Sequence, residues 1–185
     1  MQSNASLPTL RTTPYAPPAV WLHWTLAAFI IGMTALGWYM TSIEDLPGAG
    51  QYFGLHKSVG LIVAGLVLLR VLWRLSHRPA PLPVDMSAWQ VGAAKMGHGL
   101  LYAAMVVMPL SGVIGSMLGK GGIAFFGWSL PRVFAVNTDL SEIVFTVHSA
   151  TAWVLTGLVA MHVLAALKHL AIDRDGVFQR MWPAR

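Results

Sequence analysis

Apolar residues gather in four long segments, at about residues 20–40, 52–73, 96–118 and 143–170. Each segment reaches the roughly 20 residues that a helix needs to cross the hydrocarbon core of a bilayer. Stretches rich in proline and glycine separate the segments and favour turns. Because the bilayer core offers no water to an unpaired backbone group, each span is expected to be helical. The pattern predicts an all-α fold, an integral membrane four-helix bundle.

The composition leaves little room for a soluble domain. Charged residues make up 10% of the 185 residues, whereas a soluble domain carries about 25%, and the mean hydropathy is +0.62. Residues 1–18 are polar and rich in proline, and are expected to form a disordered N-terminal tail. Residues 19–175 are expected to form the transmembrane domain, and 176–185 a short basic C-terminal tail.

Basic residues are unevenly divided between the two sides of the predicted bundle. Three lie on the side of the first and third connections: Lys57, Lys120 and Arg132. Nine lie on the side of the two tails and the middle connection: Arg11, Arg70, Arg74, Arg78, Lys95, Lys168, Arg174, Arg180 and Arg185. Cytoplasmic flanks carry the excess of Lys and Arg, so both termini are predicted to be cytoplasmic. The net charge of +5 therefore indicates membrane orientation rather than nucleic-acid binding.

The chain has no cysteine. This excludes disulfides, thiolate metal sites, iron–sulfur clusters and covalent haem attachment through a C-x-x-C-H motif. Any haem must be bound non-covalently, and any metal must use imidazole, thioether, carboxylate or carbonyl ligands.

Four histidines lie inside the apolar segments, where ionisable residues are functional candidates by default. His148 and His162 are 14 residues apart in the last segment. On a helix this spacing places them about 40° apart in azimuth and about 21 Å apart along the axis. With His23 in the first segment and His56 in the second, the topology pairs His56 with His148 on the outer side and His23 with His162 on the cytoplasmic side. Two bis-histidine haems are the simplest interpretation; the alternative is that each histidine only forms hydrogen bonds within the bundle.

Other side chains are candidates for holding the haems. Arg70 lies 14 residues after His56 and should share its face near the cytoplasmic haem, where its guanidinium suits a propionate. Arg74 and Lys57 are further propionate candidates, although Arg70 and Arg74 could equally be ordinary interfacial residues. Gly32, Gly37, Gly60 and Gly157 would allow close approach of a flat macrocycle, or simply of another helix.

Two further functions involve residues near the ends of the spans. His98 and His169 could hydrogen-bond a quinone carbonyl or relay protons, or could be interfacial histidines without a role. Lys57, Lys120 and Arg132 could steer a small anion toward the outer haem. They could instead pair with nearby carboxylates, which lie at Glu44, Asp45, Asp139 and Glu142.

Several short motifs, in this order and spacing, resemble the bacterial cytochrome b561 family. They are Leu22-His23-Trp24, His56-Lys57-Ser58-Val59-Gly60, Leu69-Arg70-Val71-Leu72-Trp73-Arg74, Gly97-His98, Met108-Pro109-Leu110-Ser111-Gly112, and His148 with His162. The resemblance implies a multi-pass protein of the bacterial inner membrane that holds two haem b groups. It implies His23, His56, His148 and His162 as the axial ligands of the iron. It also implies electron exchange with the quinone pool, and some members of the family look like superoxide oxidases.

The favoured interpretation is a superoxide:ubiquinone oxidoreductase that passes electrons through the two haems. One alternative is a haem b subunit that relays electrons between quinone and a separate periplasmic redox partner. Another, of a different class, is a histidine-based metal or proton transporter, which the lack of carboxylates inside the spans disfavours. The pattern makes no prediction of oligomeric state. Residues 85–89 are expected to form a short surface helix, and the loop of residues 120–141 to fold back over the bundle.

Overall fold

The computed structural model describes residues 14–77 and 86–182. Its four long helices are α1 (Pro17–Ser42), α2 (Ala49–Ser76), α3 (Ala88–Leu118) and α4 (Thr138–Lys168). All four are long and apolar enough to cross a membrane. The predicted spans and the all-α fold are therefore confirmed, although each helix extends beyond the apolar core of its segment. The predicted N-terminal tail lies mostly outside the described residues.

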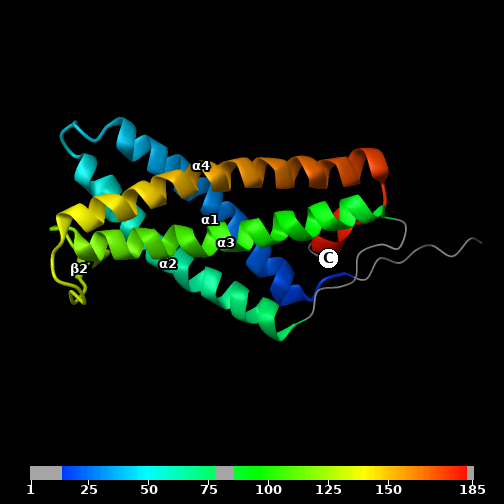
Figure 1. The fold of residues 1–185 in the computed structure, drawn as a ribbon, viewed down its shortest axis with the longest axis horizontal. Helices are drawn as coiled ribbons and strands as arrows, with labels where there is room; N and C mark the ends of the chain where they lie inside the picture. Colours follow the sequence, from blue (N-terminus) through cyan, green and yellow to red (C-terminus); the bar gives the residue numbers. More distant parts are fainter. Residues whose placement is uncertain (1–13, 78–85, 183–185) are drawn as a thin grey trace, which may run out of the picture.

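Figure 1 shows α3 and α4 running side by side along the molecule, with α1 and α2 crossing them obliquely. Close backbone packing joins α1 to α2, α2 to α3, and α3 to α4. Within the described residues, α4 has little or no such packing with α1 or α2. The start of α1, the end of α2, the start of α3 and the end of α4 lie at one end of the bundle, the terminal end (Figure 1). The α3–α4 connection lies at the other, the hairpin end (Figure 1).

The start of α3 differs from the prediction of a separate surface helix. Ala88 and Trp89 belong to the first turn of α3 itself, while Asp85 lies outside the described residues. The Gln90 side chain accepts a hydrogen bond of 3.0 Å from the Ser87 backbone N–H. This capping interaction satisfies an N–H group that the helix cannot pair internally. It marks the point from which residues 88–95 extend the span toward the terminal end.

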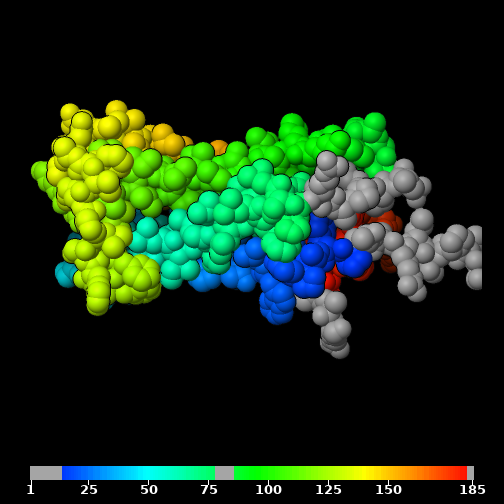
Figure 2. Space-filling model, turned by 90° about the horizontal axis from the view of Figure 1, so that it is seen from below, coloured from blue at the N-terminus to red at the C-terminus, as the bar shows by residue number. Residues whose placement is uncertain are grey.

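A small β-hairpin forms within the α3–α4 connection. Strands β1 (Ala124–Phe125) and β2 (Trp128–Ser129) pair antiparallel, with Phe125 opposite Trp128. The two turn residues, Phe126 and Gly127, have φ values of 46° and 92°, as the tight hairpin turn requires. The hairpin packs against α2 and stands at the end of the molecule away from the start of α1, as Figure 2 shows. The loop therefore folds back on the bundle as predicted.

The C-terminal segment also folds against the bundle. After α4 comes one π-helical turn, η1 (His169–Asp173), and then a 3-10 turn, η2 (Phe178–Met181). Trp24 of α1 donates a hydrogen bond of 2.7 Å from its indole N–H to the Met181 carbonyl. The Tyr15 N–H donates to the Arg180 carbonyl at 3.1 Å. These contacts hold η2 beside the start of α1.

The buried core is small, and the outward faces of the helices are apolar. One buried cluster joins Leu26 of α1 to Val63 and Val67 of α2. A second joins Ala104 of α3 to Leu155 and Leu158 of α4. Most of the remaining leucine, isoleucine and valine side chains on these helices are partly or fully exposed. An apolar outer surface of this kind is stable in lipid and would be unstable in water.

Candidate functional site

At the hairpin end, the structure brings together the predicted pair His56 of α2 and His148 of α4. Their ring centroids are 6.2 Å apart. Two metal–nitrogen bonds of about 2 Å, plus about 1.2 Å from each ring nitrogen to its centroid, give about 6.4 Å for a bis-imidazole complex. The Nδ1 atom of His56 is also buried without a hydrogen-bond partner, which is uncommon for a buried polar atom. The spacing therefore fits a metal ion between the rings.

The imidazole of His148 is oriented by α3. Its Nδ1 lies 2.9 Å from the Met108 carbonyl and 3.2 Å from the Ser111 hydroxyl. Because the carbonyl can only accept, Nδ1 carries the proton, and the lone pair is on Nε2. A metal-binding histidine is commonly fixed in this way, by a hydrogen bond from its other nitrogen. Sequence reasoning assigned no role to Met108 or Ser111, although both belong to one of the motifs.

Two glycines contact this pair of rings. A Cβ atom on Gly112 of α3 would lie 2.9 Å from Cε1 of His148. A Cβ atom on Gly37 of α1 would lie 3.4 Å from Cε1 of His56. Gly37 was among the predicted glycines, whereas Gly112 was missed. For the other predicted glycines, Gly32, Gly60 and Gly157, a Cβ would contact neither ring.

Three histidines converge toward the terminal end. The ring centroid of His162 on α4 is 6.0 Å from that of His23 on α1 and 5.5 Å from that of His98 on α3. Nδ1 of His98 lies 2.6 Å from the carbonyl of Ala94 in its own helix. A flat macrocycle needs space between the two helices that supply its ligands. Because α3 and α4 pack closely and α1 and α4 do not, the geometry favours His23 as the partner of His162.

Arg70 lies beside the His23 end of α1. Its guanidinium donates a hydrogen bond to the carbonyl of Ala19, one helical turn before His23. This places Arg70 near the terminal pair, where the sequence predicted a propionate partner. His169 does not join the three-histidine cluster; it contacts Asp173 and Asp175 beyond the end of α4. Of the two residues predicted to bind quinone, His98 therefore lies in the three-histidine cluster, whereas His169 lies beyond the end of α4 beside two carboxylates.

Two of the three predicted anion-steering residues bind backbone carbonyls at the hairpin end. Lys57 Nζ donates to the Gly122 carbonyl at 3.1 Å. Arg132 donates to the carbonyls of Met117, Gly119 and Lys120 at 2.7 to 2.8 Å. In the described part of the chain, none of the three cations lies within ion-pair distance of a carboxylate. The alternative pairing with nearby carboxylates is therefore wrong for the described residues, and in the case of Arg132 the unpaired carbonyls at the α3 terminus accept its hydrogen bonds instead.

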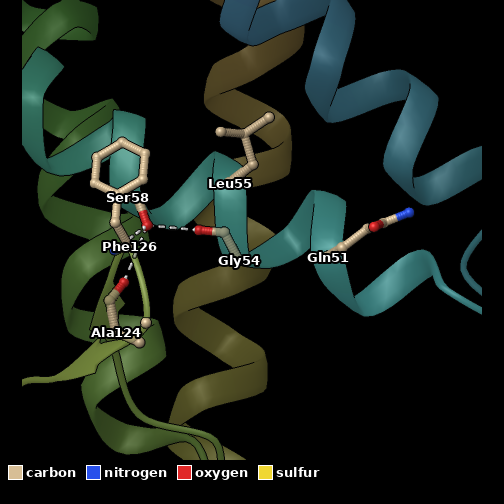
Figure 3. Close-up of a pocket in the computed structure, with 7 residues that line it drawn as sticks. Gln51, Gly54, Leu55, Ser58, Ala124 and Phe126 are labelled. Atoms are coloured by element: carbon tan, nitrogen blue, oxygen red, sulfur yellow. Dashed lines mark hydrogen bonds between the residues drawn. The ribbon is translucent and has the colours of Figure 1, made fainter.

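Ser58 fastens the hairpin to α2, two residues after His56. Its hydroxyl lies 2.8 Å from the Gly54 carbonyl and 3.2 Å from the Ala124 carbonyl, and accepts from the Phe126 N–H at 3.0 Å. Figure 3 shows these bonds beside a shallow, mostly apolar pocket. Its lining residues are Gln51, Gly54, Leu55, Ser58, Ala124, Phe126 and Gly127. Sequence reasoning missed Ser58, which is part of the His56–Gly60 motif.

Comparison with known proteins identifies the family. The model of the prokaryotic cytochrome b561 family matches residues 14–184. The chain belongs to the prokaryotic cytochrome b561 family. Among curated members, cytochrome b561 homolog 2 of Escherichia coli (strain K12) is 35% identical over 162 residues, which cover 86% of each chain. The probable superoxide oxidase CybB of Yersinia pestis is 27% identical over 177 residues, which cover 92% of this chain and 97% of the relative.

Membership of the cytochrome b561 family makes this chain a membrane electron carrier and implies haem b as its cofactor. The family relationship and the four apolar helices together confirm the predicted multi-pass membrane protein. The described residues fit the cofactor, because two imidazole pairs with ligand-like spacing lie where helices are not packed together.

Proposed function

We propose that this cytochrome carries electrons across the membrane between two bis-histidine haem b sites, one toward each end of the bundle. The observation that carries the proposal is the pair of ring separations, 6.2 Å for His56–His148 and 6.0 Å for His23–His162. Both distances are close to the roughly 6.4 Å of a bis-imidazole metal complex. When bound, the two haems would supply one-electron redox chemistry without an open coordination site for oxygen.

The protein's own residues would set the position of each group. His148 is held by the Met108 carbonyl, so its Nε2 is presented as a ligand. On α4 the two ligands are separated by 14 residues, which is about 21 Å along the helix axis. That spacing would place one site near each surface of the bilayer. Arg70 would neutralise propionate charge at the terminal site, where Arg74 is a further candidate, and Lys57 is the candidate for that role at the hairpin end.

For the overall reaction, we infer that the protein oxidises superoxide at the hairpin end and reduces ubiquinone near the terminal end. Two superoxide anions would each lose one electron to become O₂, and one ubiquinone would take up these two electrons with two protons to become ubiquinol. The relative from Yersinia pestis that is named a probable superoxide oxidase supports this choice. The excess of basic residues at the terminal end supports the cytoplasm as its location.

The cations at the hairpin end would favour an anionic substrate. Lys57 and Arg132 donate to backbone carbonyls of the 119–122 turn, which contains Lys120, and no carboxylate among the described residues lies within ion-pair distance of the three cations. A local positive potential raises the rate at which a small anion encounters a site. Lys57 directly follows the ligand candidate His56, so this potential lies beside the site where the electron enters.

Superoxide oxidation by the purified cytochrome tests this proposal directly. The protein in detergent would be mixed with ubiquinone-1 and an enzymatic source of superoxide, and ubiquinol formation followed by absorbance. The proposal expects one ubiquinol for two superoxide anions, and loss of the reaction when superoxide dismutase is added. Absence of the reaction, together with co-purification of a redox protein that reduces the cytochrome, would favour the alternative of a membrane subunit that serves a separate partner.

A further inference from the structure

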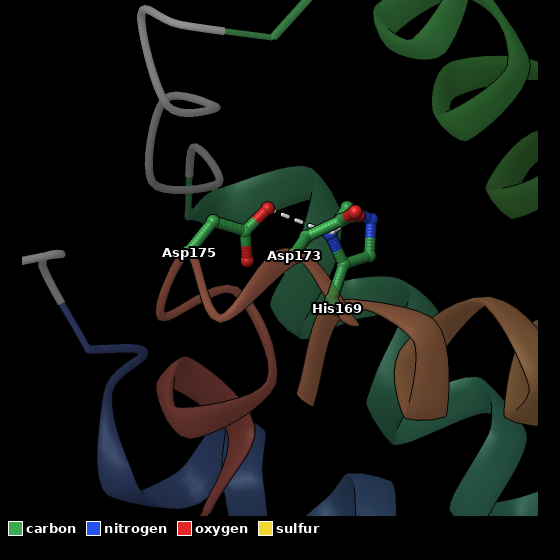
Figure 4. Close-up of side chains that lie close together, drawn as sticks. All are labelled: His169, Asp173 and Asp175. Carbon is green, nitrogen blue, oxygen red and sulfur yellow. Dashed lines mark hydrogen bonds and ion pairs between the residues drawn. The ribbon is translucent and has the colours of Figure 1, made fainter. Parts of the chain in front are cut away.

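Just beyond α4, two carboxylates hold one nitrogen of His169. Nδ1 of this histidine lies 2.7 Å from Oδ2 of Asp175 and 3.2 Å from Oδ2 of Asp173. Figure 4 shows the three side chains converging from the π-helical turn η1 and the loop that follows it. The side chains are largely shielded, with exposures of 17% for His169, 24% for Asp173 and 26% for Asp175. A carboxylate can only accept, so the proton of the neutral imidazole is on Nδ1 and the lone pair is on Nε2.

Both carboxylates are themselves fixed by neighbouring groups. Oδ1 of Asp175 accepts a hydrogen bond of 3.1 Å from the Val177 N–H. Asp173 accepts from Nζ of Lys168 through both of its oxygens. The ligand atoms of His169, Asp173 and Asp175 lie within 4.8 Å of one another, as in a metal site. The ammonium group of Lys168 already supplies a cation, however, so the cluster is better suited to orient the imidazole than to bind a metal.

The position of His169 relates it to the terminal histidine pair. It directly follows the last residue of α4 and lies seven residues after His162, which on an α-helix is about 10 Å along the axis and about 20° in azimuth. Both residues belong to the less exposed face of this part of the helix. His169 therefore lies between the level of the terminal pair and the end of the bundle, with Nε2 free of the carboxylates. The π-helical turn η1, a feature frequent at functional sites, begins at His169 and brings Asp173 toward its Nδ1, and the loop that follows brings Asp175 there.

We propose that Asp175 and Asp173 are positioning residues that hold His169 for proton transfer to quinone; this rests on the proposed reduction of ubiquinone near the terminal end. His169 with protons on both nitrogens would give the Nε2 proton to a carbonyl oxygen of the quinone as the quinone accepts electrons. The imidazole would keep its Nδ1 proton on the carboxylates and would recover the Nε2 proton from water. Two such transfers, with two electrons from two superoxide anions, would complete one ubiquinol.

The test measures the quinone half-reaction alone. The haem-loaded protein would be reduced with limiting dithionite and mixed with ubiquinone-1 in a stopped-flow instrument, and its re-oxidation followed by visible absorbance. Asp175→Asn keeps the size of the side chain but can donate to Nδ1 and so disturb its protonation. The maximum rate should fall by about 10- to 100-fold, with a larger solvent deuterium isotope effect and little change in the half-saturating quinone concentration.

Other variants separate proton transfer from a structural role. Asp175→Glu should recover most of the rate. His169→Ala should lose about 100-fold, and millimolar imidazole should restore much of it. Asp45→Asn, an exposed acid at the hairpin end, is the matched control and should behave as the wild type. Haem content and spectrum should be unchanged throughout.

The outcomes are distinguishable. Wild-type rates in Asp175→Asn or His169→Ala would overturn this inference while leaving quinone reduction intact. The inference would also be overturned if imidazole did not restore the rate of His169→Ala and the substitutions mainly raised the half-saturating quinone concentration. If the wild-type protein itself does not reduce ubiquinone-1, the proposed quinone reaction fails and this inference fails with it. A protein that reduces quinone with the expected dependence on Asp175 but does not oxidise superoxide would support the inference and refute only the electron donor.

Discussion

Replacing Gly112 by alanine should disturb the hairpin-end haem site selectively. The new Cβ would lie 2.9 Å from Cε1 of His148 and 3.2 Å from its Nδ1. Ordinary carbon–carbon contacts begin at about 3.5 Å, so the ring would have to move by about 0.6 Å. Metal–ligand distances tolerate only about 0.2 Å. The ring cannot turn freely instead, because its Nδ1 is held at 2.9 Å by the Met108 carbonyl.

The helix itself should not be weakened by this change. Alanine is favoured over glycine in a helix by about 1 kcal/mol, so any loss of haem would be due to the contact with His148. Gly65→Ala is the matched control, since a Cβ at that position on α2 meets nothing within 4 Å.

The assay would measure haem per polypeptide and its spin state in the purified Gly112→Ala protein. One low-spin haem should remain at the terminal site, and the other should be lost or become high-spin, while Gly65→Ala keeps both. Two low-spin haems with unchanged reduction potentials in Gly112→Ala would refute the assignment of His148 as a tightly positioned ligand.

Three further changes test other parts of the structure. Lys57→Gln combined with Lys120→Gln should slow superoxide oxidation and flatten its dependence on ionic strength, because the steering field is weakened; unchanged rates at low salt would exclude steering. Ser58→Ala removes the hydroxyl that binds the hairpin to α2, so it should lower the free energy of unfolding by about 1–3 kcal/mol. The loss would be measured as a lower thermal midpoint and faster proteolysis of the hairpin, while haem content is preserved. Arg70→Gln should lower the reduction potential of one haem in a redox titration, because a positive charge beside the terminal site favours the reduced state. Arg74→Gln should shift this potential less, and equal shifts would argue against a special role for Arg70.

The spans and the histidine pairing could be predicted because both follow from simple helical geometry. Hydropathy marked the four helices, and the alternating direction of successive spans placed His56 at the level of His148 and His23 at the level of His162. The first turns of α3 were not predicted as part of the span, because Gln90, Gly92 and Lys95 interrupt the apolar run and only the capping interaction at Ser87 reveals the helix start.

The environment of each site depended on contacts that leave no pattern in the sequence. The approach of His98 to His162 follows from the close packing of α3 on α4, and hydropathy does not give the lateral order of helices. Arg132 binds backbone carbonyls, and every residue type carries such an acceptor. The contact of Gly112 with His148 likewise requires the register of two helices.

The central claim is that each chain binds two haem b groups through two pairs of histidines. The most direct test is a reduced-minus-oxidised visible spectrum of the detergent-purified protein, with haem quantified per polypeptide. The two histidine pairs predict two low-spin haem b groups per chain. One haem or none, after expression with adequate haem supply, or a high-spin spectrum with an open coordination position, would contradict it.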